Sequence, residues 1–170
     1  MRKRRQLKDG ATYHVIGRVN RKEFILNSPV FKELLLQVLR EAKVKYAFHI
    51  KNFCIMGNHF HLILKPLNEQ SLSRIMQWIL SVFAIRYNKI IESNGHVWYD
   101  RFKSKIIRSF MQYIKTFIYI ATNPVRSNLV TQAVDFHYNG ISYIQKGKLD
   151  ILERPSNSLL KIVWPIIRAY

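Results

Sequence analysis

The sequence predicts an α+β fold in which four strands and two helices follow one another in the order βαββαβ, with further helices after them. Three observations support this prediction. Residues 11–19 and 58–65 alternate between apolar and polar side chains, as strands with one exposed face do. Two longer stretches, which begin at Ser28 and Ser71, repeat apolar residues with the period of a helix. The order of these elements is the split βαβ pattern of the ferredoxin-like fold.

The composition is that of a folded domain with a polyanionic partner. Of the 170 residues, 48% are apolar, which is enough for one hydrophobic core. The net charge of +18 indicates a nucleic acid as partner, and a solvated basic surface is the alternative. With Cys54 as the one cysteine, a disulfide framework is excluded. No apolar run reaches the ~18 residues of a membrane span and no signal peptide is apparent, so we expect a cytoplasmic protein without membrane contact.

The chain divides into three predicted segments. Residues 1–10 form a basic arm, residues 11–146 the main domain, and residues 147–170 a tail that we expect to be helical. A terminus without a role is the alternative reading of the arm. Its cations, which we expect to contact a phosphate backbone, include Arg2, Lys3, Arg4 and Arg5.

The first predicted strand and helix carry clear local signals. One side of the strand 11–19 is apolar, with Tyr13, Val15 and Val19. The other side carries His14 and Arg18. The helix that follows begins with Ser28 as its N-cap and Pro29 at its first position.

The next elements are a hairpin and a long helix. Residues 46–56 and 58–65 are predicted to be strands joined by a tight turn at Gly57-Asn58. The second helix is predicted to run from its N-cap Ser71 to about Glu92, where Ser93-Asn94-Gly95 ends it.

The remaining elements are a strand and helices. The fourth strand is predicted over 97–107 and a third helix over 110–122. Asn123-Pro124 is expected to end that helix, because a residue before proline avoids the helical region. A short helix in the tail, 159–170, is expected to be interrupted by Pro165.

Two histidines on the strand 58–65 are candidate metal ligands. Side chains two apart on a strand project in the same direction, ~7 Å apart at the backbone, so His59 and His61 can converge on one ion. They oppose the apolar side chains that the helices are expected to cover, so we place them on the open face of the sheet. Two polar residues on a wet face are the alternative. The apolar set is Phe60, Leu62 and Leu64.

The third predicted helix presents polar groups opposite its apolar stripe. Tyr119 and Asn123 lie one turn apart on the polar side and can supply a nucleophile and a metal ligand. Lys115, one turn before Tyr119, is a cation that could support the phenol, and a solvated lysine is the alternative. The expected core stripe consists of Phe110, Ile114, Phe117 and Ala121.

With these residues in view, the chain resembles the single-tyrosine HUH transposases, in particular the REP-associated tyrosine transposases. The resemblance covers residues 11–146, and its motifs occur in family order. It departs from the family at Gly57, where a proline is usual, and in the segment DFHYNGISYI, which lacks the tryptophan and serine pair often found there. The matching stretches are YHVIGRVNR at 13–21, MGNHFHLILKP at 56–66, GHVWYDRFKSKII at 95–107 and YIATNPVRSNLV at 119–130.

The resemblance implies a specific chemistry. In this family His59 and His61 would match the HUH ligands of Mg²⁺ or Mn²⁺, and Asn123 would complete the metal site. Tyr119 would match the nucleophile that forms a 5′-phosphotyrosine bond. The substrate would be single-stranded DNA with a hairpin nearby, and the enzyme a DNA strand transferase whose catalytic domain is 11–146.

Further residues are candidates for DNA contact. In a ferredoxin-like sheet the first strand lies beside the third, so His14 and Arg18 would share a face with the two histidines. His14 could support the ligands or contact DNA, and a surface histidine is the alternative. The fourth strand carries a basic stripe, which we expect to bind phosphates unless it is only solvated: Arg101, Lys103 and Lys105.

Other functions remain open from the sequence. The main alternative is a domesticated, catalytically inactive DNA-binding protein of the same fold. An RRM-like module would carry aromatic side chains where His59 and His61 stand. A rolling-circle initiator or relaxase would share the HUH site. The sequence also allows a monomer or a homodimer, with Tyr119 acting in its own chain or in a partner.

Overall fold

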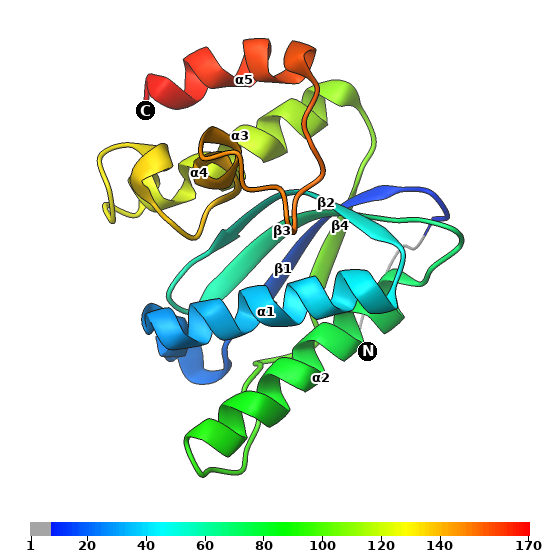
Figure 1. The fold of residues 1–170 in the computed structure, drawn as a ribbon, viewed down its shortest axis with the longest axis vertical. Coiled ribbons are helices and arrows are strands. Elements are labelled where there is room, and N and C mark those ends of the chain that lie inside the picture. Colours follow the sequence, from blue (N-terminus) through cyan, green and yellow to red (C-terminus); the bar gives the residue numbers. More distant parts are fainter. Residues whose placement is uncertain (1–7) are drawn as a thin grey trace.

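A four-stranded antiparallel sheet forms the centre of the structure, and helices cover both of its faces (Figure 1). The computed structural model describes residues 8–170, so the cations Arg2, Lys3, Arg4 and Arg5 lie outside the described residues. The strands lie in the order β2-β3-β1-β4. This is the predicted ferredoxin-like arrangement. The strand bounds are β1 Thr12–Arg18, β2 Phe48–Ile55, β3 His59–Pro66 and β4 Lys103–Ile107.

Two layers of helices enclose this sheet. Figure 1 shows α1 and α2 on one side and α3, α4 and α5 on the other. None of the helices within residues 8–170 is long and apolar enough to cross a membrane. The helix bounds are α1 Pro29–Lys45, α2 Leu72–Ile90, α3 Phe110–Arg126, α4 Gly140–Gln145 and α5 Asn157–Arg168. Short 3-10 turns occupy Asn20–Lys22, Ile25–Asn27 and Ala133–Asp135.

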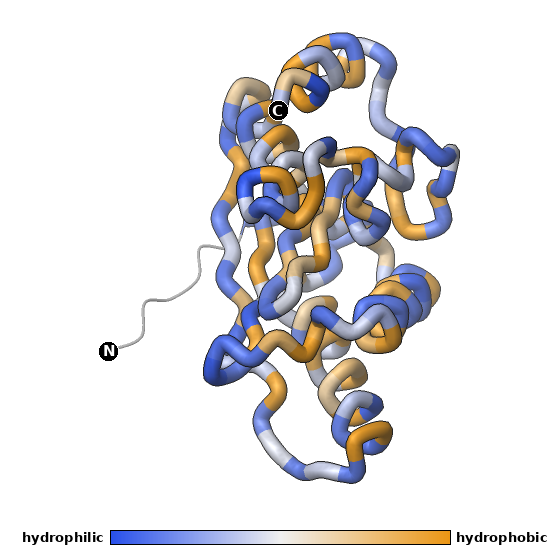
Figure 2. The backbone as a smooth tube through the Cα atoms, turned by 90° about the vertical axis from the view of Figure 1, so that its left-hand side faces the viewer, coloured by the Kyte–Doolittle hydropathy of each residue, from blue (hydrophilic) through white to orange (hydrophobic). Residues whose placement is uncertain are grey.

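The two faces of the sheet belong to two separate apolar clusters. The larger cluster joins α1 and α2 to the side of the sheet that carries Val15, Phe60 and Leu62. The smaller one joins α3 and α5 to the opposite side, where Ile63 is fully buried. Figure 2, turned by 90°, shows hydrophobic and hydrophilic residues alternating along the chain. This alternation allows β2 and β3 to contribute side chains to both clusters.

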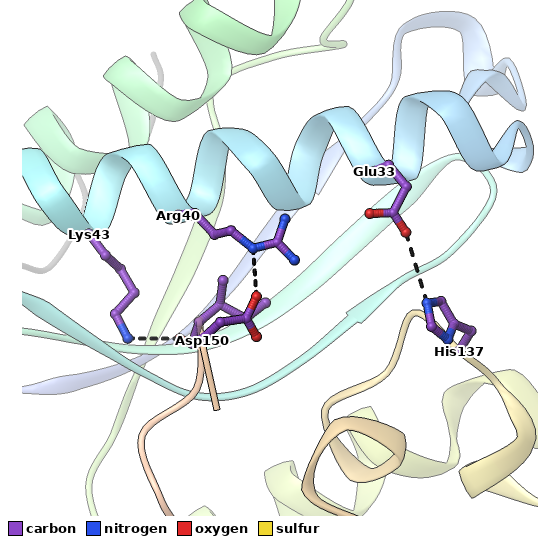
Figure 3. Close-up of polar contacts among 6 residues, drawn as sticks. Glu33, Arg40, Lys43, His137 and Asp150 are labelled. Carbon is purple, nitrogen blue, oxygen red and sulfur yellow. Dashed lines mark hydrogen bonds and ion pairs between the residues drawn. The ribbon is translucent and has the colours of Figure 1, made fainter. Parts of the chain in front are cut away.

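The segment after α3 wraps around the β2 edge of the sheet. The backbone N–H of Ile55 donates to the Tyr138 carbonyl (2.9 Å), and the N–H of Glu153 donates to the Ile50 carbonyl (2.8 Å). Side-chain contacts continue this attachment on to α1, as Figure 3 shows. The contacts are Arg40 with Asp150, Lys43 with the Ile151 carbonyl, and Glu33 with His137. The wrapped segment therefore covers one edge strand and leaves β4 as the open edge.

The fourth strand is shorter than predicted. The chain 97–102 still follows β1, since the N–H of Tyr99 donates to the Arg18 carbonyl (2.9 Å), but it is not part of the regular ladder. The Asp100 carboxylate accepts a hydrogen bond from the N–H of Arg101 (2.7 Å), and this local turn interrupts the strand. Arg101 therefore lies in a bend before β4 rather than on the predicted stripe.

Two prolines were wrongly expected to limit helices. α3 runs through Pro124 to Arg126, and α5 runs through Pro165 to Arg168. Pro124 is buried with the preceding Asn123, so packing outweighs the local preference against a helical residue before proline.

Phe110, which was expected in the core stripe, is exposed, and so are two other apolar residues near helix ends. The exposed fractions of Val30, Ile90 and Phe110 are 60%, 53% and 61%. Each lies at the first or last turn of its helix, where the apolar stripe has passed the end of the packed surface.

Candidate active site

The histidine pair of β3 lies on the sheet face that α3 crosses. In the strand register His59 is opposite Arg18, and His61 is opposite Ile16. The prediction that His61 lies on an open face of the sheet is wrong, because its side chain is only 3% exposed. The reason is that α3 lies over this part of the sheet and packs its apolar stripe into the second cluster.

His61 is hydrogen-bonded to a third histidine from the neighbouring strand. Its Nδ1 lies 3.0 Å from Nε2 of His14, and the two rings are stacked with their centroids 5.2 Å apart. If His61 donates from Nδ1, its Nε2 keeps a free lone pair, and His14 accepts through Nε2. The partner of one ring nitrogen thus leaves the other available as a ligand.

The tautomer of His59 is fixed in the same way, by Asn58 in the turn that precedes it. Its Nδ1 lies 2.7 Å from Oδ1 of Asn58, which can only accept, so the Nε2 of His59 is also left with a lone pair. The rings of His59 and His61 are 4.9 Å apart and nearly perpendicular. The two imidazoles therefore converge without stacking on each other.

Burial keeps these imidazoles uncharged at neutral pH. It lowers the pKa of His61 to about 3, with smaller contributions from His59 and His14. Burial, followed by the Lys105 charge, lowers the pKa of His14 to about 4. The pKa of His59 is lowered too, first by burial and then by the Arg18 charge. Neutral imidazole is the form that binds metal ions.

Helix α3 brings the candidate nucleophile to these rings. The Tyr119 ring lies 5.6 Å from the ring of His61 and 6.1 Å from that of His14, and its side chain is 39% exposed. Asn123, one turn further on, is buried, with its amide nitrogen 3.5 Å from Nε2 of His61. Because the oxygen and nitrogen of an amide are assigned from their surroundings, a half-turn of this amide would present Oδ1 to the same point.

Two buried asparagines hold α3 by its backbone. Nδ2 of Asn52, on β2, donates to the Phe117 carbonyl (3.0 Å), and Nδ2 of Asn139 donates to the Ala121 carbonyl (2.7 Å). Both side chains are fully buried. The two carbonyls lie one turn apart and flank Tyr119 in the sequence, so these contacts fix the position of the turn that carries it.

The donor set fits a divalent metal ion. Within residues 8–170 no group of three histidine, cysteine, aspartate or glutamate side chains is arranged to hold a metal ion, so a third protein ligand must be of another type. His59, His61 and the amide of Asn123 would offer two nitrogens and an oxygen. Such mixed ligands suit Mn²⁺ and related ions, and Mg²⁺ if water supplies further oxygens.

Most of the predicted basic residues share this face. Lys103 is paired in register with Ile16, and Lys105 with His14, so both point to the histidine side of the sheet. Arg18 does the same opposite His59. All three are exposed, as is Arg101 in the bend before β4. Lys115 is also exposed, on the same helix as Tyr119.

Three residues at this site were not predicted from the sequence. The guanidinium of Arg126 lies over the Tyr119 ring, 5.5 Å from its centroid. Its position two helical turns after Tyr119 could have been recognised had the helix been extended through Pro124. Asn52 and Asn139 carried no sequence signal, because a buried asparagine and one in a loop look alike in a single sequence.

Comparison with known proteins identifies the family. The family model described as "Transposase IS200 like" matches residues 8–123. The chain belongs to the IS200-like transposase family. Among curated protein sequences, none matches this transposase significantly.

Two solved structures have a similar fold. One is a REP-associated tyrosine transposase bound to a REP hairpin, 21% identical, with a TM-score of 0.75 over 94% of this chain and 96% of that one. The other is a putative transposase from Deinococcus radiodurans, 15% identical, with a TM-score of 0.50 over 76% of this chain and 98% of that one. At these identities the likeness concerns the fold, and it agrees with the predicted resemblance.

Proposed function

We propose that this transposase cleaves and rejoins single-stranded DNA through a covalent bond between Tyr119 and a 5′-phosphate. The observation that carries the proposal is the meeting of Tyr119 and Asn123, from α3, with His61, from β3. A nucleophile, neutral ring nitrogens and an amide thus lie at one place, which is the arrangement that metal-assisted phosphoryl transfer requires.

The chemical step is a transesterification at phosphorus. The phenolic oxygen of Tyr119 attacks the scissile phosphate, the bond to the 3′-oxygen breaks, and the 3′-oxygen takes up a proton. The phenol proton passes to solvent, which reaches the partly exposed Tyr119. Attack by a 3′-hydroxyl on the phosphotyrosine reverses the step, so joining needs no ATP.

Asn123, His59 and His61 would hold Mg²⁺ or Mn²⁺, which when bound supplies Lewis-acid polarisation of the phosphate. His14 would orient His61 through the hydrogen bond between their rings. Arg126, above the Tyr119 ring, would place a guanidinium beside the phenolate and the phosphate.

The DNA would approach along the face of the sheet beside β4. Exposed cations there would neutralise its phosphates: Arg18, Arg101, Lys103 and Lys105. We include a hairpin in the proposed substrate, because the similar solved transposase is bound to a REP hairpin. Tyr119 and Asn123 contact His61 of the same folded chain, so we propose that a single subunit holds the complete site.

The decisive experiment is a covalent-adduct assay. Single-stranded DNA from both flanks of the encoding gene would be incubated with the protein and Mn²⁺ or Mg²⁺, then resolved on a denaturing gel. We expect a metal-dependent adduct that is absent in Tyr119→Phe and in His61→Ala. Tyr113→Phe is the matched control, since Tyr113 packs beside Phe117 and burial raises its pKa to about 12.

Two results would contradict the proposal. An adduct that persists in Tyr119→Phe would assign the nucleophile elsewhere. Tight DNA binding by the wild-type protein without an adduct on any flanking strand would favour a domesticated DNA-binding protein.

A further inference from the structure

A small pocket opens beside Tyr119, between the open edge of the sheet and α3. Its volume is about 270 Å³. One wall comes from β1 and β4, and the other from the first half of α3. Its lining consists of His14, Lys105, Gln112, Lys115, Thr116 and Tyr119.

The charge of this pocket is positive. Lys105 reaches it from β4 and Lys115 from α3, and no carboxylate is among its lining residues. Neither lysine takes part in an ion pair within the part of the chain that the structure describes. Two ammonium groups without acidic partners on facing walls form a site for an anion.

Two further polar side chains of the pocket, Gln112 and Thr116, are already engaged with the backbone. Oε1 of Gln112 accepts a hydrogen bond from the N–H of Arg108 (2.8 Å), and the Thr116 hydroxyl donates to the Gln112 carbonyl (2.8 Å). These side chains are therefore poorly placed to read the edge of a base. The pocket favours a charged group over a particular base.

The pocket is adjacent to the proposed reaction centre. Tyr119 and His14 line it, and the same two rings lie 5.6 and 5.2 Å from the ring of His61. An anion held there would thus lie next to a phosphate held at the histidine pair. In a DNA strand the next anionic group along the backbone, beyond one sugar, is the following phosphate.

We infer that Lys105 and Lys115 together bind one phosphate of the DNA strand, the neighbour of the scissile phosphate. This inference rests on the proposed function, because it takes the histidine pair as the place of the scissile phosphate. The pocket would fix the strand at two successive phosphates, which aligns the scissile bond with Tyr119.

The first test is the salt dependence of DNA binding. For single strands, each neutralised phosphate contributes about −0.7 to the slope of log K against log salt. The probe is a (dT)15 oligonucleotide, measured by fluorescence anisotropy with Tyr119→Phe protein and with the same protein carrying Lys105→Gln and Lys115→Gln. One shared phosphate predicts that the slope becomes shallower by about 0.7. Lys89→Gln, at the far end of α2, is the matched control and should leave the slope unchanged.

The same measurement can overturn the inference. An unchanged slope would mean that the lysines bind no phosphate. A change of about 1.4 would mean that each binds a phosphate of its own.

The second test locates the phosphate. Neutral methylphosphonate linkages would be placed one at a time in the flanking oligonucleotide that gives an adduct, on both sides of the cleavage point. We expect one neutral linkage next to the cleavage point to weaken binding to the Tyr119→Phe protein by about 3-fold or more. The same linkage should not weaken binding to the protein in which both lysines are also replaced by glutamine. Additive losses at every linkage would contradict a shared phosphate.

The outcomes separate this inference from the proposed function. If the wild type forms an adduct but the salt slope is unchanged, the two lysines do not bind a phosphate and the proposed chemistry still holds. If no flank gives an adduct but the slope becomes shallower by about 0.7, the lysines bind a phosphate and the proposed cleavage chemistry is contradicted.

Discussion

The two faces of the central sheet differ in how they are built, although the same strands make both. On β3, Phe60 and Leu62 point to α1 and α2 and are fully buried among apolar side chains. Their neighbour His61 points to α3 and is buried almost as deeply, but beside His14, Tyr119 and Asn123. One strand therefore supplies a packed core on one side and a reactive cluster on the other.

The difference teaches that burial serves two purposes here. On the apolar face burial provides stability, because removing carbon surface from water is favourable in itself. On the histidine face burial opposes protonation and makes each polar group depend on a defined partner. The apolar face is close-packed as well: a Cβ added at Gly17 would lie 2.3 Å from the Phe60 ring.

The largest expected effect compares adjacent residues of β3. Phe60→Ala should lower the free energy of unfolding by about 3–5 kcal/mol, because it opens a cavity in the core. His61→Leu should lower it by only about 1–2 kcal/mol, since the apolar side chain suits the buried position but leaves His14 and Asn123 without this partner. Its effect should be on chemistry, with complete loss of the adduct. Urea denaturation and the adduct assay measure the two effects.

Two results would contradict this division between a stabilising apolar face and a reactive histidine face. A loss of more than about 2 kcal/mol in His61→Leu would mean that the histidine cluster is also a main source of stability. Conversely, loss of the adduct in Phe60→Ala protein that is still folded would mean that the apolar face takes part in positioning the site.

The sequence predicts the first face better than the second. Period-two and helical patterns identified β1, β3, α1 and α2, because burial on the apolar face selects residue types directly. The same patterns placed His59 and His61 together on the other face. They could not reveal that α3 lies over this face, because a helix that packs on a half-polar surface has no distinct signature.

The helix α3 also shows how tertiary contacts override local rules. Pro124 was expected to end it at residue 122, yet the helix continues to Arg126. The missing turn carries the guanidinium that covers Tyr119. Asn52 and Asn139, which hold the same helix, lie in a bulged strand and a loop, and their partners are backbone carbonyls distant in sequence. Such contacts depend on the folded arrangement and not on residue type.

The next prediction sharpens the role of His14 on the histidine face. His14→Leu removes the acceptor for Nδ1 of His61, so the His61 ring loses its fixed orientation. We expect the affinity for Mn²⁺ to fall by about 10–100-fold. Isothermal titration calorimetry with Mn²⁺ alone measures this without any cleavage.

His14→Gln is the matched variant, because its side-chain oxygen can accept a hydrogen bond. It should recover part of the Mn²⁺ affinity. Equal affinities in wild type and His14→Leu would show that His14 does not orient a metal ligand, even if its loss weakens DNA binding.

The smallest expected effect concerns the attachment of α3 to β2. Asn52→Leu keeps the size of the side chain but removes the hydrogen bond to the Phe117 carbonyl, and Phe53 loses the acceptor for its N–H. We expect a loss of about 1–3 kcal/mol in the free energy of unfolding. Because the turn that carries Tyr119 would shift, the rate of adduct formation by folded protein should fall by roughly 3- to 10-fold.

A control on the other face separates positioning from stability. Ile79→Val, buried between α2 and the sheet, should cost about 0.5–1.5 kcal/mol through lost packing alone. Its adduct rate should equal that of the wild type at a temperature where both proteins are folded. If Asn52→Leu behaves in the same way, the asparagine only stabilises the fold. If the adduct rate falls only in Asn52→Leu, the hydrogen bond from Asn52 to the Phe117 carbonyl positions Tyr119 relative to β2. A backbone contact on the histidine face would then serve the reaction, whereas packing on the apolar face serves stability alone.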